Sequence, residues 1–257
     1  MTLLLTEIVI PVDEDPFIVF AADRRISREG KRVAERKKVF AIGARKAGIG
    51  YYGLAEVERS RRHREAMETW LDEFLARHTT TTSLQGIADS LAKELNRDVP
   101  EHTRKVAESG FHLAGFNAEG HPEFWFIRNV DDQKKVIGIY EARKDHPKHN
   151  DVPAPGSLYW FRNGDLRAHE AAWQGMDNTF GELAKSPGFS RSLSPKDYAR
   201  WVAFKLEIVA RFYETFSKAS SIGRPVDAFV ISQNGIKVVA PAPTPNHLRR
   251  NRARSGS

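Results

Sequence analysis

The sequence contains no cysteine among its 257 residues. That absence excludes disulfide bonds, thiolate metal sites and cysteine nucleophiles, so any covalent catalysis must use another side chain. Long apolar runs are also missing, because no stretch approaches the roughly 20 residues that a membrane-spanning helix needs. The first segment, MTLLLTEIVIPVDEDP, has neither a basic leader nor a small-residue cleavage site. We therefore expect a cytoplasmic protein with no membrane partner.

The composition is that of a soluble globular protein, with 40% hydrophobic and 28% charged residues. A net charge of +7 slightly favours a polyanionic partner. Much of the excess lies in the final HLRRNRARSGS, which follows the proline-rich PAPTP and lacks apolar periodicity. We expect one domain over residues 1–240 and a disordered basic tail over residues 241–257. Nucleic acid is not an expected partner, and a tail that tethers the protein to a polyanion is the weaker hypothesis.

Strand-like segments come in pairs that are separated by turn residues. The last turn, QNG, is of the Asn-Gly type that joins two antiparallel strands tightly. The four predicted hairpins join residues 2–10 to 17–22, 37–42 to 47–52, 111–116 to 123–127, and 226–232 to 236–241.

Helical periodicity occupies the intervals between these hairpins. We predict helices over residues 55–78, from a cap at Ser83 to about residue 96, and over residues 195–217. The last helix carries one apolar stripe of Trp201, Phe204, Ile208 and Phe212. A polar insertion is expected over residues 131–157, with its one strand at 137–140. Strand runs that are segregated from helix runs predict an α+β fold with largely antiparallel sheets.

The stretch from Phe17 to Ala55 concentrates the candidate chemistry. Asp23 ends one apolar strand and Lys38 opens the next, so a carboxylate and an ammonium should lie close together. Gly53 ends a third strand before a predicted helix, where a backbone N–H suits a developing oxyanion. A structural ion pair of Asp23 with Lys38 is the simpler interpretation and remains open.

Thr2 is the candidate nucleophile. Removal of Met1 would leave a threonine that carries both a hydroxyl and a free α-amine. The α-amine has a pKa of about 7.7 to 8, so near neutral pH it can accept the hydroxyl proton. The alternative is that Thr2 is only the second codon of the gene.

Two further patterns do not support a bound cofactor. GIGYYG satisfies GxGxxG, but the residues before it are ARKA and helical sequence stands where the acidic strand of a dinucleotide site belongs. Asp145, His146 and His149 are close in sequence but lie in a Pro- and Lys-rich segment. We therefore expect neither a cofactor nor a metal ion.

Taken in order, these segments resemble the proteasome β-type subunits and their bacterial relatives, within the N-terminal nucleophile (Ntn) hydrolases. FIVFAADRRIS, RKKVFAIG and GIGYYGLA are similar to the family's Ala-Ala-Asp-x-Arg segment, lysine strand and glycine turn. LAGFNAEGHPEFWFI is similar to its second hairpin, and WQGMDNTFGEL to the segment that leads into its third helix. KASSIGRPVDAFVISQNGIKVV resembles its last passage from helix to strand. The resemblance covers roughly Thr2 to Val239 apart from the insertion, and it implies a four-layer αββα sandwich of two antiparallel sheets flanked by helices.

The resemblance also implies a role for each matching position. Thr2 would be the nucleophile, Lys38 the residue that tunes it, Asp23 the partner of Lys38, and Gly53 the oxyanion donor. The substrate backbone would bind at Ser27, and the main side-chain pocket would be lined by Ile26, Tyr51 and Ala55. Gln174 stands where the family has a serine beside the nucleophile, and Ala219 stands where it has an aspartate, for which Ser220 or Ser221 would substitute.

The resemblance thus implies a threonine-type hydrolase of peptide or protein substrates, a homo-oligomeric ring, and no cofactor or metal. An unfolding partner that delivers substrates is not identified by the sequence. The alternative is a non-catalytic scaffold or assembly subunit that uses the same fold.

Overall fold

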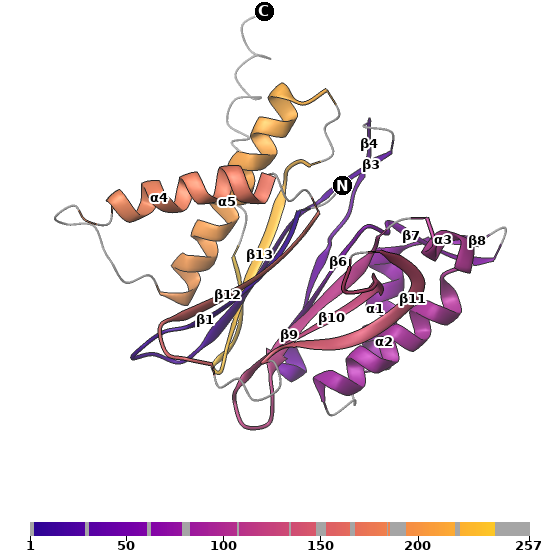
Figure 1. The fold of residues 1–257 in the computed structure, drawn as a ribbon, viewed down its shortest axis with the longest axis horizontal. Helices are drawn as coiled ribbons and strands as arrows, with labels where there is room; N and C mark the ends of the chain where they lie inside the picture. Colours follow the sequence, from indigo (N-terminus) through magenta and orange to yellow (C-terminus); the bar gives the residue numbers. More distant parts are fainter. Residues whose placement is uncertain are drawn as a thin grey trace, which may run out of the picture.

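The computed structural model shows a mixed α+β protein with antiparallel sheets, as the sequence predicts (Figure 1). The structure describes residues 3–28, 31–60, 63–78, 83–106, 108–133, 135–147, 153–164, 168–183, 185, 194–218 and 222–239. Thr2, Ala219, Ser220, Ser221 and the tail from residue 240 onward therefore lie outside the described residues.

The first five-stranded sheet contains both the beginning and the end of the described chain. Its spatial order is β12, β1, β2, β13, β14, and all four pairings are antiparallel. The first and last predicted hairpins, β1–β2 and β13–β14, are confirmed. The strands are β1 (Leu3–Ile10), β2 (Phe17–Asp23), β12 (Ser157–Gly164), β13 (Val226–Ser232) and β14 (Gly235–Val239).

The second five-stranded sheet has the order β11, β10, β9, β6, β5, again antiparallel throughout. The two middle predicted hairpins, β5–β6 and β9–β10, are confirmed. A 3-10 turn, Gly43–Arg45, connects the first of these pairs. The strands are β5 (Val39–Ile42), β6 (Ala47–Tyr52), β9 (Gly110–Phe116), β10 (Pro122–Val130) and β11 (Val136–His146).

Within the expected insertion over residues 131–157, the strand β11 is longer than the sequence predicts. Residues 136–146 are the edge strand of the second sheet, well beyond the predicted strand at 137–140. Gly138 and Tyr140 of β11 are buried while Ile139 and Glu141 are exposed, so alternate residues face the core and the solvent, and the strand can carry many polar residues.

Two short two-stranded hairpins lie outside the large sheets. β3 (Arg25–Arg28) pairs with β4 (Lys31–Glu35), and β7 (Glu56–Ser60) pairs with β8 (His63–Ala66). The predicted helix over residues 55–78 is therefore wrong in its first half. α1 begins only at Met67, where the first of its buried apolar residues occurs.

The helices cover the outer faces of the two sheets, which gives the order helices, sheet, sheet, helices (Figure 1). α1 and α2 pack on the second sheet through a core that includes Trp70, Leu91 and Ile127. α5 packs on the first sheet, and Phe20 and Phe124 belong to the core between the sheets. The helices are α1 (Met67–Arg77), α2 (Leu84–Asp98), α3 (Glu101–Arg104), α4 (Trp173–Leu183, preceded by a π-turn at Ala168–Ala172) and α5 (Pro195–Phe216). Within the described ranges, no helix combines the length and the apolar character needed to cross a bilayer.

The predicted helix cap at Ser83 is present, and the structure adds a second cap at Ser194. The Ser83 hydroxyl accepts a hydrogen bond from the Gly86 amide at 3.0 Å, and Ser194 accepts one from Asp197 at 3.2 Å. Each cap satisfies an amide that has no partner within the helix, so α2 and α5 begin where the sequence places them.

The face that α5 buries is not the one that carries the predicted apolar stripe. The residues against the sheet are Ala199, Val202, Lys205, Leu206, Val209 and Ala210. The aromatic stripe faces away from them, since Phe204 is 50% and Phe212 is 56% exposed. α5 therefore has two apolar faces, and the more aromatic one is exposed at Phe204 and Phe212, whereas Trp201 packs against Phe180 of α4 with ring centroids 4.7 Å apart.

Candidate functional site

The candidate site is centred on a fully buried ion pair. Asp23 is the last residue of β2, and Lys38 lies immediately before β5. The two side chains, each 0% exposed, lie with Lys38 Nζ 3.0 Å from Asp23 Oδ1. Lys38 Nζ also donates to the carbonyl oxygen of Arg25 at 2.7 Å. The structure thus brings together the carboxylate and the ammonium that the sequence predicts as neighbours.

Backbone amides from three parts of the chain donate to the Asp23 carboxylate. Leu3 N donates to Oδ1 at 2.8 Å, while Arg25 N and Gly223 N donate to Oδ2 at 3.2 and 3.3 Å. Amide donors favour the charged form of a carboxylate and compensate for its lost hydration. The three amides therefore hold the Asp23 carboxylate in a fixed orientation.

Burial and the ion pair have opposite effects on Lys38. Burial lowers the pKa of its ammonium below the ordinary value, and the charge and hydrogen bond of Asp23 oppose that shift. The positive charge of Arg25 lowers the pKa of Lys38 further. Since the net direction is downward, Lys38 gives up its proton more readily than a solvated lysine.

Gly53 follows β6 with φ of +80°, a conformation that favours glycine. A Cβ at this position would also collide with the carbonyl oxygen of Glu108 and with Ser109. The predicted helix does not follow it, because β7 begins at Glu56. Any anion bound at the Gly53 amide would therefore lack the support of a helix dipole.

The predicted substrate-contacting residues share one surface depression. A small cleft of about 80 Å³ is lined by Arg25, Ile26, Ser27, Tyr51, Gly53, Leu54 and Ala55. A neighbouring cleft of about 290 Å³ shares Ile26, Ser27, Leu54 and Ala55 and extends toward Glu58, Arg64 and Thr103. Tyr51 is otherwise buried, and its ring lies 6.4 Å from that of Phe40.

The predicted supporting residues are not brought to this place by the described structure. Gln174 is exposed in the first turn of α4 and lines neither cleft. Thr2, Ser220 and Ser221 lie outside the described residues. Chain connectivity nevertheless keeps residue 2 next to Leu3, whose amide contacts Asp23.

Glu214, Arg25 and Arg224 form a charged cluster beside the site, here called the clasp, which the sequence analysis did not predict. Glu214, near the end of α5, accepts hydrogen bonds from Arg25 Nη2 at 3.1 Å, Arg224 N at 3.0 Å and Arg224 Nε at 2.9 Å. Arg25 lies against Gly223, where a Cβ would overlap its guanidinium. The clasp therefore joins α5 to two segments that contact Asp23. The helical periodicity of residues 195–217 places Glu214 on a helix. Its partners Arg25 and Arg224 are brought to it only by the tertiary structure.

We predict that Glu214→Gln destabilises the protein by about 1–3 kcal/mol, because hydrogen bonds that involve charged groups become weaker neutral ones. The measurement is the midpoint of urea unfolding, with the exposed Asp72→Asn on α1 as the control. The clasp has no such role if the two variants unfold at the same urea concentration.

No protein-family model and no curated protein matches the chain. Function must therefore be inferred from the geometry of this chain.

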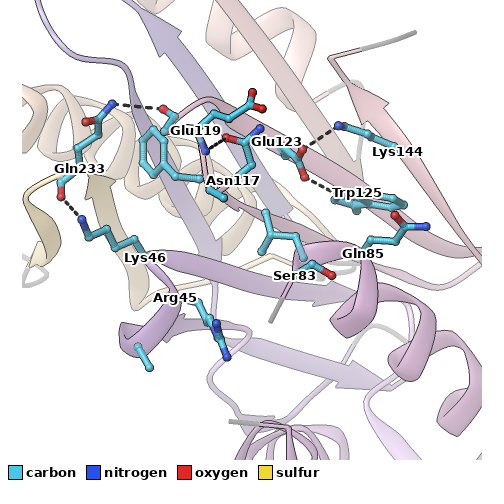
Figure 2. Close-up of a pocket in the computed structure, with 15 residues that line it drawn as sticks. Arg45, Lys46, Ser83, Gln85, Asn117, Glu119, Glu123, Trp125, Lys144 and Gln233 are labelled. Atoms are coloured by element: carbon cyan, nitrogen blue, oxygen red, sulfur yellow. Dashed lines mark hydrogen bonds and ion pairs between the residues drawn. The ribbon is translucent and has the colours of Figure 1, made fainter. Parts of the chain in front are cut away.

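A larger cleft of about 740 Å³ lies at the opposite end of β6 (Figure 2). Its walls come from the Gly43–Arg45 turn, the start of α2, the β9–β10 turn and Gln233. Its charged groups are already engaged, since Lys144 pairs with Glu123 at 2.8 Å and Lys46 donates to the Gln233 carbonyl at 2.5 Å. Glu123 also accepts from Trp125 Nε1 at 3.3 Å. Its larger volume alone therefore does not make this cleft a better candidate for the functional site than the clefts beside Gly53.

The structure corrects the expected position of His146, one of the three residues that were considered as metal ligands. His146 is buried at the end of β11 with its ring 4.1 Å from that of Tyr159, whereas the sequence places it in a polar loop. His149 lies outside the described residues. Among the residues that are described, no three His, Asp or Glu side chains are placed to hold a metal ion.

Proposed function

We propose that this chain is a threonine-type hydrolase of peptide or other amide bonds, with the αββα fold of the proteasome-like Ntn hydrolases. Removal of Met1 would expose Thr2 as the nucleophile. The observation that carries the proposal is the pair of contacts at Asp23 Oδ1, which accepts from Leu3 N at 2.8 Å and Lys38 Nζ at 3.0 Å. One carboxylate oxygen thus links the residue after Thr2 to a buried ammonium.

The proposed reaction begins with the Thr2 hydroxyl. Its oxygen attacks the substrate carbonyl carbon while the hydroxyl proton passes to the free α-amine. The neighbouring charge of Lys38 favours the neutral, proton-accepting form of that amine, and Asp23 stabilises Lys38 in its charged form. The Gly53 amide donates to the oxyanion of the tetrahedral intermediate.

The remaining steps restore the enzyme. The C–N bond breaks, and the leaving amine takes the proton from the α-ammonium, which leaves an ester on Thr2. Water then attacks this ester, with the α-amine again accepting the proton, and the acid product departs with the Thr2 oxygen reprotonated. Every proton is supplied by Thr2 or water, so the proposed cycle uses no cofactor.

The clefts beside Gly53 support a peptide substrate. Ser27 lies on the strand β3 along these clefts, where it would bind the peptide backbone. Ile26, Tyr51 and Ala55 would line the pocket for one side chain. The adjoining cleft of about 290 Å³ gives room for further residues of an extended chain.

The test is a mass measurement on the full-length protein, treated with an electrophile directed at N-terminal threonine. We expect a chain that begins at Thr2 and carries one adduct on that residue. Thr2→Ala should abolish both adduct and hydrolysis, whereas Thr2→Ser keeps a hydroxyl and should retain measurable activity. A correctly processed, assembled protein without a Thr2 adduct would overturn the proposal.

A non-catalytic scaffold is the second candidate, and the exposed aromatic face of α5 favours it. A scaffold would bind its partners equally well with Thr2→Ala. The catalytic proposal also includes assembly into a homo-oligomeric ring in the cytoplasm, with an unfolding partner that is not identified. Gel filtration combined with light scattering would measure the assembly separately from the activity.

A further inference from the structure

The main chain of Arg25 contacts both members of the buried ion pair. Its amide donates to Asp23 Oδ2 at 3.2 Å, and its carbonyl oxygen accepts from Lys38 Nζ at 2.7 Å. A shift of this one peptide segment would therefore move the carboxylate and the ammonium together. The geometry of the site thus depends on what holds Arg25 in place.

The side chain of Arg25 is held by Glu214 of α5. Arg25 Nη2 donates to Glu214 Oε1 at 3.1 Å, and the two side chains are only 9% and 19% exposed. On its other side the guanidinium lies against Gly223, where a Cβ would overlap it. A charge-assisted hydrogen bond in such a shielded place is stronger than an ion pair on the surface. Glu214 therefore restricts where Arg25 can lie.

Glu214 also holds the second segment that reaches Asp23. It accepts from Arg224 N at 3.0 Å and from Arg224 Nε at 2.9 Å. The residue before Arg224 is Gly223, whose amide donates to Asp23 Oδ2 at 3.3 Å. The amides of Arg25 and Gly223, which both bind Asp23 Oδ2, thus belong to two segments that are held by the same carboxylate.

The sequence after Glu214 offers no other carboxylate for this role. Ala219 stands where the proteasome family has an aspartate, and residues 215–226 contain neither Asp nor Glu. The next carboxylate, Asp227, accepts from Arg24 Nε and Nη2, each at 2.6 Å. Glu214 is therefore the carboxylate that the end of α5 brings to the site.

Charge as well as position is transmitted by Arg25. Burial lowers the pKa of Lys38, Asp23 opposes this shift, and the positive charge of Arg25 lowers the pKa further. The carboxylate of Glu214 lies against Arg25 and compensates part of that positive charge. Loss of the Glu214 charge would therefore lower the pKa of Lys38 still more.

We propose that Glu214 is a positioning residue for the candidate site, and that it supplies from α5 the supporting carboxylate that is absent at Ala219. It acts on Asp23 and Lys38 through the segments of Arg25 and Gly223 and does not touch the substrate. Its effect on the reaction rests on the proposed hydrolase function, whereas its effect on Lys38 does not.

Titration of Lys38 tests the positioning role without any catalysis. In the full-length protein labelled with ¹³C at lysine Cε, the Lys38 resonance is assigned by its loss in Lys38→Arg. We expect Glu214→Gln to lower the pKa of Lys38 by roughly half to one pH unit, because a nearby negative charge is lost. Glu207→Gln is the matched control, since it makes the same change on the same helix at a residue outside the clasp.

A second substitution shows whether the effect passes through Arg25. Arg25→Met in the Glu214→Gln protein removes the uncompensated positive charge, so the pKa of Lys38 should rise again toward the wild-type value. Glu214→Asp keeps the charge on a side chain that is one methylene shorter, and it should lower the pKa less than Glu214→Gln does. Circular dichroism checks that each variant is folded, and Glu214→Asp takes the place of Glu214→Gln if the latter does not fold.

The rate of Thr2 adduct formation is the second readout. We expect Glu214→Gln to slow the reaction about tenfold or more at saturating electrophile and to shift its pH profile, because the groups around the nucleophile are misplaced. The electrophile concentration that gives half of the maximal rate should change little, since Glu214 lines neither cleft beside Gly53. Glu207→Gln should match the wild type in all of these values.

A purely structural role for Glu214 predicts a different result. Glu214→Gln would then be folded and less stable, with the pKa of Lys38 and the pH profile of the wild type, and this outcome would overturn the proposal. An equal effect of Glu207→Gln would overturn it too. Absence of a Thr2 adduct in the wild type would instead contradict the hydrolase function, and the titration of Lys38 would still decide the role of Glu214.

Discussion

Asp23→Ala is expected to lower the free energy of unfolding by about 3–5 kcal/mol, because it leaves the Lys38 ammonium buried without its counter-ion. Both side chains are 0% exposed, so water cannot replace the carboxylate without a local rearrangement. The amides of Leu3 and Gly223 also lose their acceptor. Urea unfolding at pH 7 measures the loss.

A double variant separates the cost of the unpaired charge from the loss of packing. Asp23→Ala with Lys38→Met removes both charges and should be more stable than Asp23→Ala alone. The remaining loss of unfolding free energy then comes from ordinary polar and apolar contacts. The exposed pair Glu182 and Lys185 is the matched control, and Glu182→Ala should cost less than about 0.5 kcal/mol. An Asp23→Ala variant that loses less than about 1 kcal/mol would contradict a buried, essential ion pair.

Acid should destabilise the protein through His112, which lies between the two sheets and is 0% exposed. Its Nε2 donates to Asn163 Oδ1 at 2.5 Å, and its Nδ1 accepts from the Thr6 hydroxyl at 2.9 Å. Phe124 and Phe126 surround the ring, with centroids at 5.1 and 4.9 Å. Burial in this apolar setting lowers the pKa of His112 to about 3.

The sign of the pH effect follows from that shift. The unfolded chain binds a proton at His112 below pH ~6.5, whereas the folded protein does so only near pH 3. Stability is therefore complete above pH ~6.5 and falls as the pH drops toward 3, by up to about 1.4 kcal/mol per pH unit. Urea unfolding between pH 7 and pH 4.5 measures this slope.

A matched substitution assigns the slope to the correct histidine. His112→Gln retains hydrogen-bonding groups but cannot titrate, so its stability should depend less steeply on pH than that of the wild type. His121, with a side chain that is 66% exposed, is the control, and His121→Gln should keep the wild-type slope. Equal slopes in the wild type and His112→Gln would contradict the depressed pKa.

The hairpins could be predicted because their information is local. Apolar strands that end at turn residues specify β1–β2 and β13–β14 without reference to the rest of the chain. Serine caps likewise mark the starts of α2 and α5. Turn residues and helix caps of this kind are compatible with few other secondary structures. The α+β class could therefore be predicted from the sequence.

The errors arose where local pattern does not determine the partner. The segment 56–66 has many charged residues that suit a helix, yet it pairs as the β7–β8 hairpin because tertiary context overrides weak helix propensity. In α5, apolar residues occupy two faces, and periodicity cannot tell which of them meets the sheet. Lys205 is also on the inner face, where its Nζ lies 3.9 Å from the centroid of the Trp173 ring. A lysine at this position makes the inner face look polar in the sequence.

The candidate site was predictable in its side chains and not in its backbone groups. Asp23 was evident as the charge that ends one apolar strand, and Lys38 as the last of the basic residues that open the next. The Arg25 carbonyl and the Gly223 amide have no side-chain signature, because every residue provides such groups and only the fold selects them. Glu214 joins the site from a helix that is distant in sequence, for the same reason.

The contact between Gly223 and Asp23 joins residues that are 200 positions apart. During synthesis, Asp23 is added to the chain early. Its hydrogen bond with the Gly223 amide can form only after almost the whole chain has been made. At about 5–20 residues per second, that interval is on the order of ten seconds or more. A nascent or truncated chain therefore holds Asp23 with fewer donors, and the geometry around Lys38 is completed only in the finished protein.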